Sequence, residues 1–178
     1  GAFDETLMLD LRDNPLEPHL GIYSEVRVSE GGGYAAGSLD YTEVVPEIRG
    51  YLPVPYSGVV LAGRFRYGAI YGDIPPTERF YAGGAASNRG FYARMLSPSL
   101  TGPVNGTTIT VPYGGGGMID TSVEMRFPIM TIKKMPLNGV TFMDGGDVTN
   151  TPGELSLGNL NWAAGFGLRL ITIVGPIR

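Results

Sequence analysis

Residues 161–173 read NWAAGFGLRLITI, and from Trp162 to Leu170 every second side chain is apolar. The apolar positions are Trp162, Ala164, Phe166, Leu168 and Leu170. The positions between them include Gly165, Gly167 and Arg169. Successive side chains of a β-strand point to opposite faces of its sheet. The pattern therefore predicts a strand with one apolar face, and a slip of one residue would place Arg169 on that face.

Six further segments show the same alternation and are predicted strands: 5–14, 20–29, 38–51, 59–71, 119–127 and 140–147. In the third of them the alternation slips around Val44, Val45 and Pro46, which predicts a bulge or a sheet edge. Across the set, one face is apolar and the other carries charges. The charged positions are Glu25, Arg27, Arg64, Arg66, Glu124, Arg126 and Arg169.

The segment 73–117 interrupts this series because it shows no strand periodicity. It contains prolines at positions 75, 76, 98, 103 and 112 and ends in four consecutive glycines. A connection of this length is uncommon in a compact domain unless it is functional. We therefore predict one long loop with little regular structure.

Composition excludes several classes of function. The chain has a net charge of -4, no cysteine and one histidine, His19. A basic nucleic-acid-binding face, a cysteine-ligated zinc site, disulfides and a multi-histidine metal site are therefore not expected. A hydrolytic triad could use only His19, and no Gly-x-Ser-x-Gly turn accompanies it. We expect no enzyme activity, no metal and no cofactor.

The same strands are consistent with two architectures, a soluble β-sandwich and a transmembrane β-barrel. No stretch reaches the ~20 apolar residues of a membrane-spanning helix, and the mean hydropathy is +0.05. Barrel strands alternate between lipid and lumen, so their average hydropathy stays near neutral. The predicted strands exceed the ~5–6 residues usual in globular sheets. Their length and their charged second face favour the barrel.

Five blocks of sequence carry a resemblance to a known family. Residues 80–98 read FYAGGAASNRGFYARMLSP, with an Arg-Gly-Phe after a Gly-Gly pair and before a Ser-Pro. The other blocks are DLRDNPLEPHLG (10–21), SVEMRFP (122–128), VTFMDGGDV (140–148) and AGFGLRLITIVGPIR (164–178). In this order and over nearly the whole chain, they resemble the barrel of the BamA/TamA family of outer-membrane protein assembly factors.

The resemblance implies an all-β fold, an antiparallel transmembrane β-barrel. Residues 1–178 would be a fragment from the C-terminal part of the barrel domain, with about seven strands. These would be the eighth to the fourteenth strands of the family's sixteen-stranded barrel, and residues 175–178 would open the fifteenth. The loop 73–117 would fold back into the lumen, with residues 81–93 against the concave face of the sheet.

The resemblance also assigns roles to individual residues. Arg89 would be the cation inserted into the lumen, with Glu124 and Asp144 as its partners on the wall. Gly90 would allow a tight turn beside Arg89, and Phe91 would pack the loop tip. A buried charge needs a partner, and guanidinium with carboxylate gives short, directional bonds.

By the same resemblance, the parent protein would sit in the bacterial outer membrane and help fold and insert other outer-membrane proteins. Its expected partners are outer-membrane lipid, unfolded client proteins, periplasmic accessory proteins, and the remainder of its own barrel and periplasmic domains. Two alternatives stay open at this point. One is a secretion pore of the two-partner type, or a barrel that anchors another domain. The other is a soluble β-sandwich that acts as a binding module.

Overall fold

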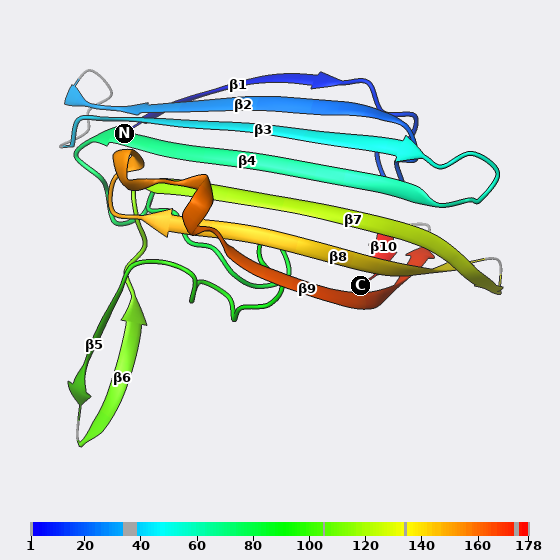
Figure 1. Ribbon diagram of the computed structural model, residues 1–178. Helices are drawn as coiled ribbons and strands as arrows, with labels where there is room; N and C mark the ends of the chain where they lie inside the picture. Colours follow the sequence, from blue (N-terminus) through cyan, green and yellow to red (C-terminus); the bar gives the residue numbers. More distant parts are fainter. Residues whose placement is uncertain (1, 34–38, 105, 134, 173–174, 178) are drawn as a thin grey trace.

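The computed structural model describes residues 2–33, 39–104, 106–133, 135–172 and 175–177. Its main feature is one eight-stranded antiparallel sheet with the order β1-β2-β3-β4-β7-β8-β9-β10 (Figure 1). The strands are β1 (Ala2–Asp10), β2 (Gly21–Gly31), β3 (Tyr41–Pro53), β4 (Val60–Gly72), β7 (Gly117–Ile132), β8 (Met135–Thr149), β9 (Asn161–Thr172) and β10 (Gly175–Ile177). The predicted all-β antiparallel fold is confirmed. The β-sandwich alternative is wrong for the described residues, because their long strands form a single open sheet.

The two faces of the sheet differ in chemistry. We call the face that carries Asp120, Glu124 and Asp144 the inner face, and the opposite face the outer face. On β9 the outer side chains Phe166 and Leu168 are 88% and 61% exposed, whereas the inner Arg169 is 3% exposed. The predicted alternation in β9 is therefore confirmed. None of the described helices is long and apolar enough to cross a membrane.

Strand β3 keeps a constant register, so the predicted bulge around Val44 to Pro46 is wrong. Val44, Val45 and Pro46 pair in sequence with Val28, Arg27 and Val26 of β2. Val45 points to the inner face, where it joins a group of buried apolar side chains. The alternation is broken in sequence because this inner position is apolar, not because the strand slips. The predicted ends at Ser38 and Ile173, as well as Arg178, lie outside the described residues.

The first strand ends earlier than predicted, because residues 11–20 form a turn. One carboxylate oxygen of Asp13 accepts hydrogen bonds from the backbone N–H groups of His19 (2.9 Å) and Leu20 (3.1 Å). The bonds from Leu20 and His19 hold the pKa of Asp13 below its ordinary value. In the same turn, Glu17 accepts a 2.7 Å hydrogen bond from Arg169 of β9. The turn between the first two strands thus reaches the inner face of β9.

The connection between β4 and β7 is more regular than the sequence predicts. Strands β5 (Ser99–Val104) and β6 (Thr107–Pro112) pair as an antiparallel hairpin that projects away from the sheet (Figure 1). The prediction of a loop with little regular structure rested on the missing periodicity, the prolines and the glycines of this segment, and two of those prolines, Pro103 and Pro112, lie within the hairpin. In a two-stranded hairpin each strand has one unpaired edge, so a residue without an N–H group is tolerated there. Two short 3-10 helices, Pro152–Glu154 and Leu157–Asn159, connect β8 and β9 and were also not predicted.

The rest of the β4–β7 connection, which we call the inner loop (residues 73–98), covers part of the inner face. Its base packs on a hydrophobic cluster in which three loop side chains contact four strand side chains. The cluster consists of Phe80, Ala82 and Leu96 from the loop and Val45, Ile70, Met118 and Val148 from the strands. Backbone pairing of Phe80 with Gly115 and of Ala82 with Leu96 fixes the shape of the base.

The two faces of β9 predict that an introduced arginine should be much more destabilising on the outer face than on the inner face. Leu168→Arg, on the outer face, should lower the free energy of unfolding in a bilayer by ~2–4 kcal/mol, because it places a charge in hydrocarbon. Gly167→Arg should have a smaller effect, since the inner face at Gly167 is open to a side chain. Urea unfolding of the full-length parent protein in lipid vesicles measures both. Equal losses for the two variants would contradict the assignment of the faces.

Candidate functional site

The tip of the inner loop is a compact turn built around two glycines. Gly83 and Gly84 have φ values of +100° and +88°, which residues with a Cβ atom rarely adopt. The backbone N–H of Gly84 donates to the carbonyl oxygens of Asn88 (3.0 Å) and Phe91 (2.9 Å). This closed turn holds Arg89 at its end, facing strands β7 and β8.

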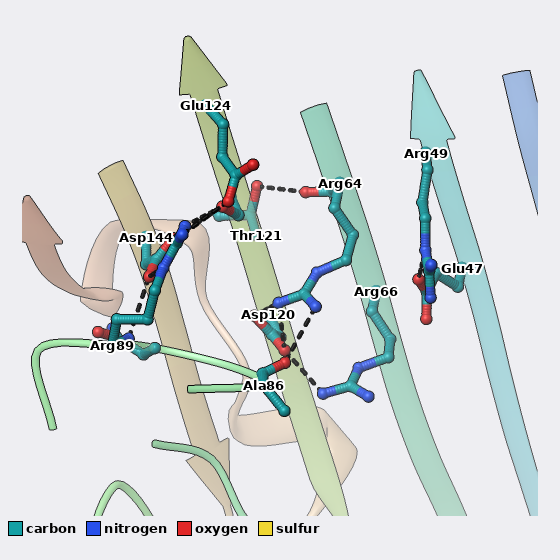
Figure 2. A network of polar contacts seen from close by, with 12 residues as sticks. Glu47, Arg49, Arg64, Arg66, Ala86, Arg89, Asp120, Thr121, Glu124 and Asp144 are labelled. Carbon is teal, nitrogen blue, oxygen red and sulfur yellow. Dashed lines mark hydrogen bonds and ion pairs between the residues drawn. The ribbon is translucent and has the colours of Figure 1, made fainter. Parts of the chain in front are cut away.

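Arg89 is bound by two strands through its backbone and its whole guanidinium group (Figure 2). Asp144 of β8 accepts from the backbone N–H (3.0 Å), Nε (2.7 Å) and Nη2 (2.6 Å) of Arg89. Glu124 of β7 accepts from Nη1 at 2.6 Å, and Ser122 accepts from Nη2 at 3.0 Å. The guanidinium carbon lies 3.6 Å from the centre of the Phe142 ring. All side-chain nitrogens of Arg89 therefore have partners.

The carboxylates around Arg89 are shielded from solvent. Asp144 is fully buried and Glu124 is 8% exposed. The hydroxyl of Ser122 donates to Asp144 (2.7 Å), and Arg126 donates to the second oxygen of Glu124 (3.0 Å). Burial by itself would lower the pKa of Arg89, but the hydrogen bonds to Asp144 and the charge of Glu124 outweigh it and raise the pKa. Arg89 is therefore a permanent cation.

Asn88 forms a second attachment, to β9. Its side chain is fully buried, and its Nδ2 donates to the backbone carbonyl of Asn161 at 2.7 Å. Its Oδ1 accepts from the backbone N–H of Gly90 at 3.2 Å. Asn88 thus orders the backbone around Arg89 and also attaches the loop tip to β9.

Gly90 lies in the tight turn that we expected, in which the backbone N–H of Phe91 donates to the carbonyl oxygen of Asn88 (3.3 Å), but it is close packing that requires a glycine there. It is not among the glycines with positive φ. A Cβ atom at this position would lie 2.3 Å from the Cβ of Ala163 in β9, which is far inside van der Waals contact. Phe91 is half buried and packs against the hydrophobic cluster at the loop base. The side chain of Phe91 therefore packs against the base of the loop.

A neighbouring contact involves two arginines of β4 (Figure 2). Asp120 of β7 is fully buried and accepts from Arg64 (2.9 Å) and Arg66 (2.7 Å). Arg64 also donates to the backbone carbonyl of Ala86 in the loop at 3.0 Å. The loop tip is therefore held by β4 as well as by β7, β8 and β9.

Sequence reasoning named Arg89, Glu124 and Asp144, which the structure brings together, but it missed several of their neighbours. The missed residues are Arg64, Asn88, Ser122, Arg126 and Phe142. A usable signal existed for three of them. Ser122 and Arg126 lie two residues from Glu124, and Phe142 lies two residues from Asp144, so each shares the inner face with a named partner. Within the described residues, no group of three or more His, Asp or Glu side chains could hold a metal ion.

An open sheet of long strands, apolar outside and charged inside, with a loop held on its inner face, defines an outer-membrane β-barrel protein. The chain belongs to the Omp85 superfamily, whose domain description matches residues 2–178. It is 34% identical over 174 residues to the outer membrane protein assembly factor BamA of Nitratidesulfovibrio vulgaris, covering 95% of this chain and 21% of that protein. The chain therefore spans about a fifth of the length of this relative.

A solved structure shows the same fold. The crystal structure of BamA from Haemophilus ducreyi lacking POTRA domains 1–3 superposes with a TM-score of 0.83 and 18% sequence identity. The match covers 98% of this chain and 37% of that one. The open sheet of this chain therefore corresponds to a part of a larger barrel.

The contacts of Arg89 predict the effect of its removal. Arg89→Ala leaves two buried carboxylates without their shared cation, which should lower the free energy of unfolding of the full-length barrel by more than about 1 kcal/mol. The loss should stay below the ~3–5 kcal/mol of a fully dry pair, because Arg89 keeps some solvent access. Arg89→Lys should recover only part, since an ammonium group lacks the planar fork. Heat-modifiability on a gel measures this, and unchanged transition temperatures for both variants would refute it.

The close packing of Gly90 against Ala163 predicts that a substitution at Ala163 should compensate for one at Gly90. Gly90→Ala should destabilise the docked loop by ~1–3 kcal/mol, because the added methyl overlaps that of Ala163. Ala163→Gly removes the overlapping methyl, so the double variant should be more stable than Gly90→Ala alone. Proteolysis of the loop in the folded barrel is a suitable measurement. Additive destabilisation in the double variant would show that the contact is not what requires glycine.

Proposed function

We propose that the protein containing this chain folds and inserts proteins into the bacterial outer membrane, and that residues 1–178 are the C-terminal part of its barrel. The named function of the Nitratidesulfovibrio vulgaris relative supports assembly over a secretion pore or an anchor for another domain. The clients are unfolded outer-membrane proteins, and the surrounding partner is outer-membrane lipid. Periplasmic domains and accessory proteins deliver the clients. The activity is not enzymatic and uses no cofactor.

The observation that carries the proposal is the attachment of Arg89 to Glu124 and Asp144. A barrel that assembles other barrels has to keep its own wall ordered while a client strand passes along it. The inner loop joins four strands through the contacts of Arg64, Asn88 and Arg89. It therefore works as an internal brace, and the role of Arg89, Gly90 and Phe91 is to hold that brace in place.

Replacement of the chromosomal gene in the source bacterium tests the proposal. Cells that carry Arg89→Ala should contain less folded outer-membrane protein than wild type, and Arg89→Lys should give an intermediate amount. Arg27→Ala is the matched control, because Arg27 lies on the same inner face but its side chain is 49% exposed, and its one ion pair among the described residues is with Glu43 at 3.4 Å. The readout is the heat-modifiable fraction of several abundant outer-membrane proteins.

Depletion of the protein provides the second arm of this test. Loss of the whole protein should leave unfolded outer-membrane proteins in the periplasm. Normal levels of folded outer-membrane proteins after depletion would overturn the assembly function. Reduced levels on depletion together with normal levels in Arg89→Ala cells would overturn only the role of the brace.

A further inference from the structure

Strands β7 and β8 are the longest of the described strands, and their hairpin continues past the residues that pair with the neighbouring strands (Figure 1). Strand β4 pairs with β7 only as far as Arg126, and β9 pairs with β8 only from Leu137 onward. We call residues 127–137 the hairpin tip. It lies at the end of the sheet opposite the inner loop.

A β-bulge in the hairpin tip sets the direction of its apolar side chains. The pairing of β7 with β8 shifts by one residue between Pro128 and Met130. Before the shift the even-numbered residues of β7 face inward, as Glu124 does. The shift reverses this order, because Met130 then stands opposite Leu137, an outer residue of β8. Met130 and Ile132 are 56% and 41% exposed. The outer face of the tip therefore carries four apolar side chains, those of Met130, Ile132, Met135 and Leu137.

The hairpin tip extends the apolar band of the outer face to its lower limit. On β9 this band begins at Trp162 and ends at Leu170, which stands opposite Leu137. That stretch covers about 20 Å of the bilayer normal at ~3.3 Å per residue and a tilt of ~40°. The apolar band of an outer-membrane barrel is about 25 Å tall, so roughly two more residues of strand lie in hydrocarbon. The band therefore ends at the pair of Ile132 and Met135.

Just beyond this limit the hairpin tip is positively charged. Lys133 follows Ile132 and is exposed, and it forms no ion pair within the part of the chain that the structure describes. The whole chain has a net charge of -4, yet residues 125–143 contain three basic residues and no acidic one. The chain has two lysines, at positions 133 and 134, and the second lies outside the described residues. The adjacent turn, residues 54–59, contains no acidic residue either.

The length of the connections identifies the side of the membrane on which the hairpin tip lies. Its end of the sheet carries the turn 54–59, whereas the opposite end carries the connection 73–116 (Figure 1). Outer-membrane barrels have short turns on the periplasmic side and longer loops on the extracellular side. The hairpin tip therefore lies at the periplasmic leaflet.

We propose that the hairpin tip binds anionic phospholipid of the periplasmic leaflet, with Lys133 at the headgroup and the four outer apolar side chains against the acyl chains. A lysine near the membrane surface attracts negatively charged headgroups. Its long stem can stay beside apolar side chains while the ammonium group reaches the headgroup. The tip is continuous with the lipid-facing outer face, which favours lipid over a periplasmic protein as the occupant. This inference does not depend on the assembly function.

Fluorescence quenching by brominated lipids tests the proposal. The full-length parent protein, free of other cysteines, carries Met130→Cys with an attached fluorophore, in vesicles of phosphatidylcholine and phosphatidylglycerol. Phosphatidylglycerol with brominated acyl chains should quench the fluorophore more strongly than brominated phosphatidylcholine at the same mole fraction. A fluorophore on Leu168→Cys, in the middle of the outer face, should be quenched equally by both. Equal quenching by both lipids at position 130 would overturn the proposal. Protection from both lipids there would also overturn it, in favour of a protein occupant or water.

Variants at Lys133 test which group selects the lipid. Lys133→Gln should lower the preference for phosphatidylglycerol by about fivefold, the effect of one lysine near an anionic surface. Lys133→Arg keeps the charge and should keep the preference. Arg27→Gln removes a positive charge from the inner face and should leave the preference as in wild type. Heat-modifiability on a gel should be the same for all of them, because Lys133 is exposed and Arg27 half exposed. An unchanged preference in Lys133→Gln would show that this lysine does not bind the lipid.

Discussion

A guanidinium group that moves from water to the surface of a sheet loses its hydration, and only correctly placed carboxylates compensate for that loss. Arg89 imposes this constraint on the whole inner face. Glu124 and Asp144 have to stand on neighbouring strands, at positions that reach one side chain. The same two acids would be costly without the cation, because they are buried close together. Loop and wall therefore stabilise each other through this contact.

The inner loop is held by two kinds of interaction that have different effects. At its base, Phe80, Ala82 and Leu96 bury apolar surface against the strands, which stabilises the contact without fixing its geometry. At its tip, the hydrogen bonds of Asn88 and Arg89 are short and directional. The base therefore stabilises the docked loop, and the hydrogen bonds at the tip fix where the loop lies on the sheet. Gly90 in the tip allows the backbone of the loop to approach Ala163 of β9 closely.

The alternation of residues was sufficient to predict the long strands and their faces, because each strand has one apolar side and one charged side. It failed at Val45, where the inner side is locally apolar beneath the loop, and at the β5–β6 hairpin, where prolines occupy unpaired edges. The partners of Arg89 came from family motifs. The contact of Gly90 with Ala163 was out of reach, because it depends on the distance between two segments and leaves no local pattern.

The hydrogen bond between Glu17 and Arg169 joins residues that are 152 positions apart in the chain. Closing so long a stretch of chain costs more conformational entropy than closing a local turn. The bond therefore depends on the strands between these residues, which bring the turn after β1 and the inner face of β9 within reach of each other. A break in the pairing of any of these strands would remove a contact that lies far from the break in sequence.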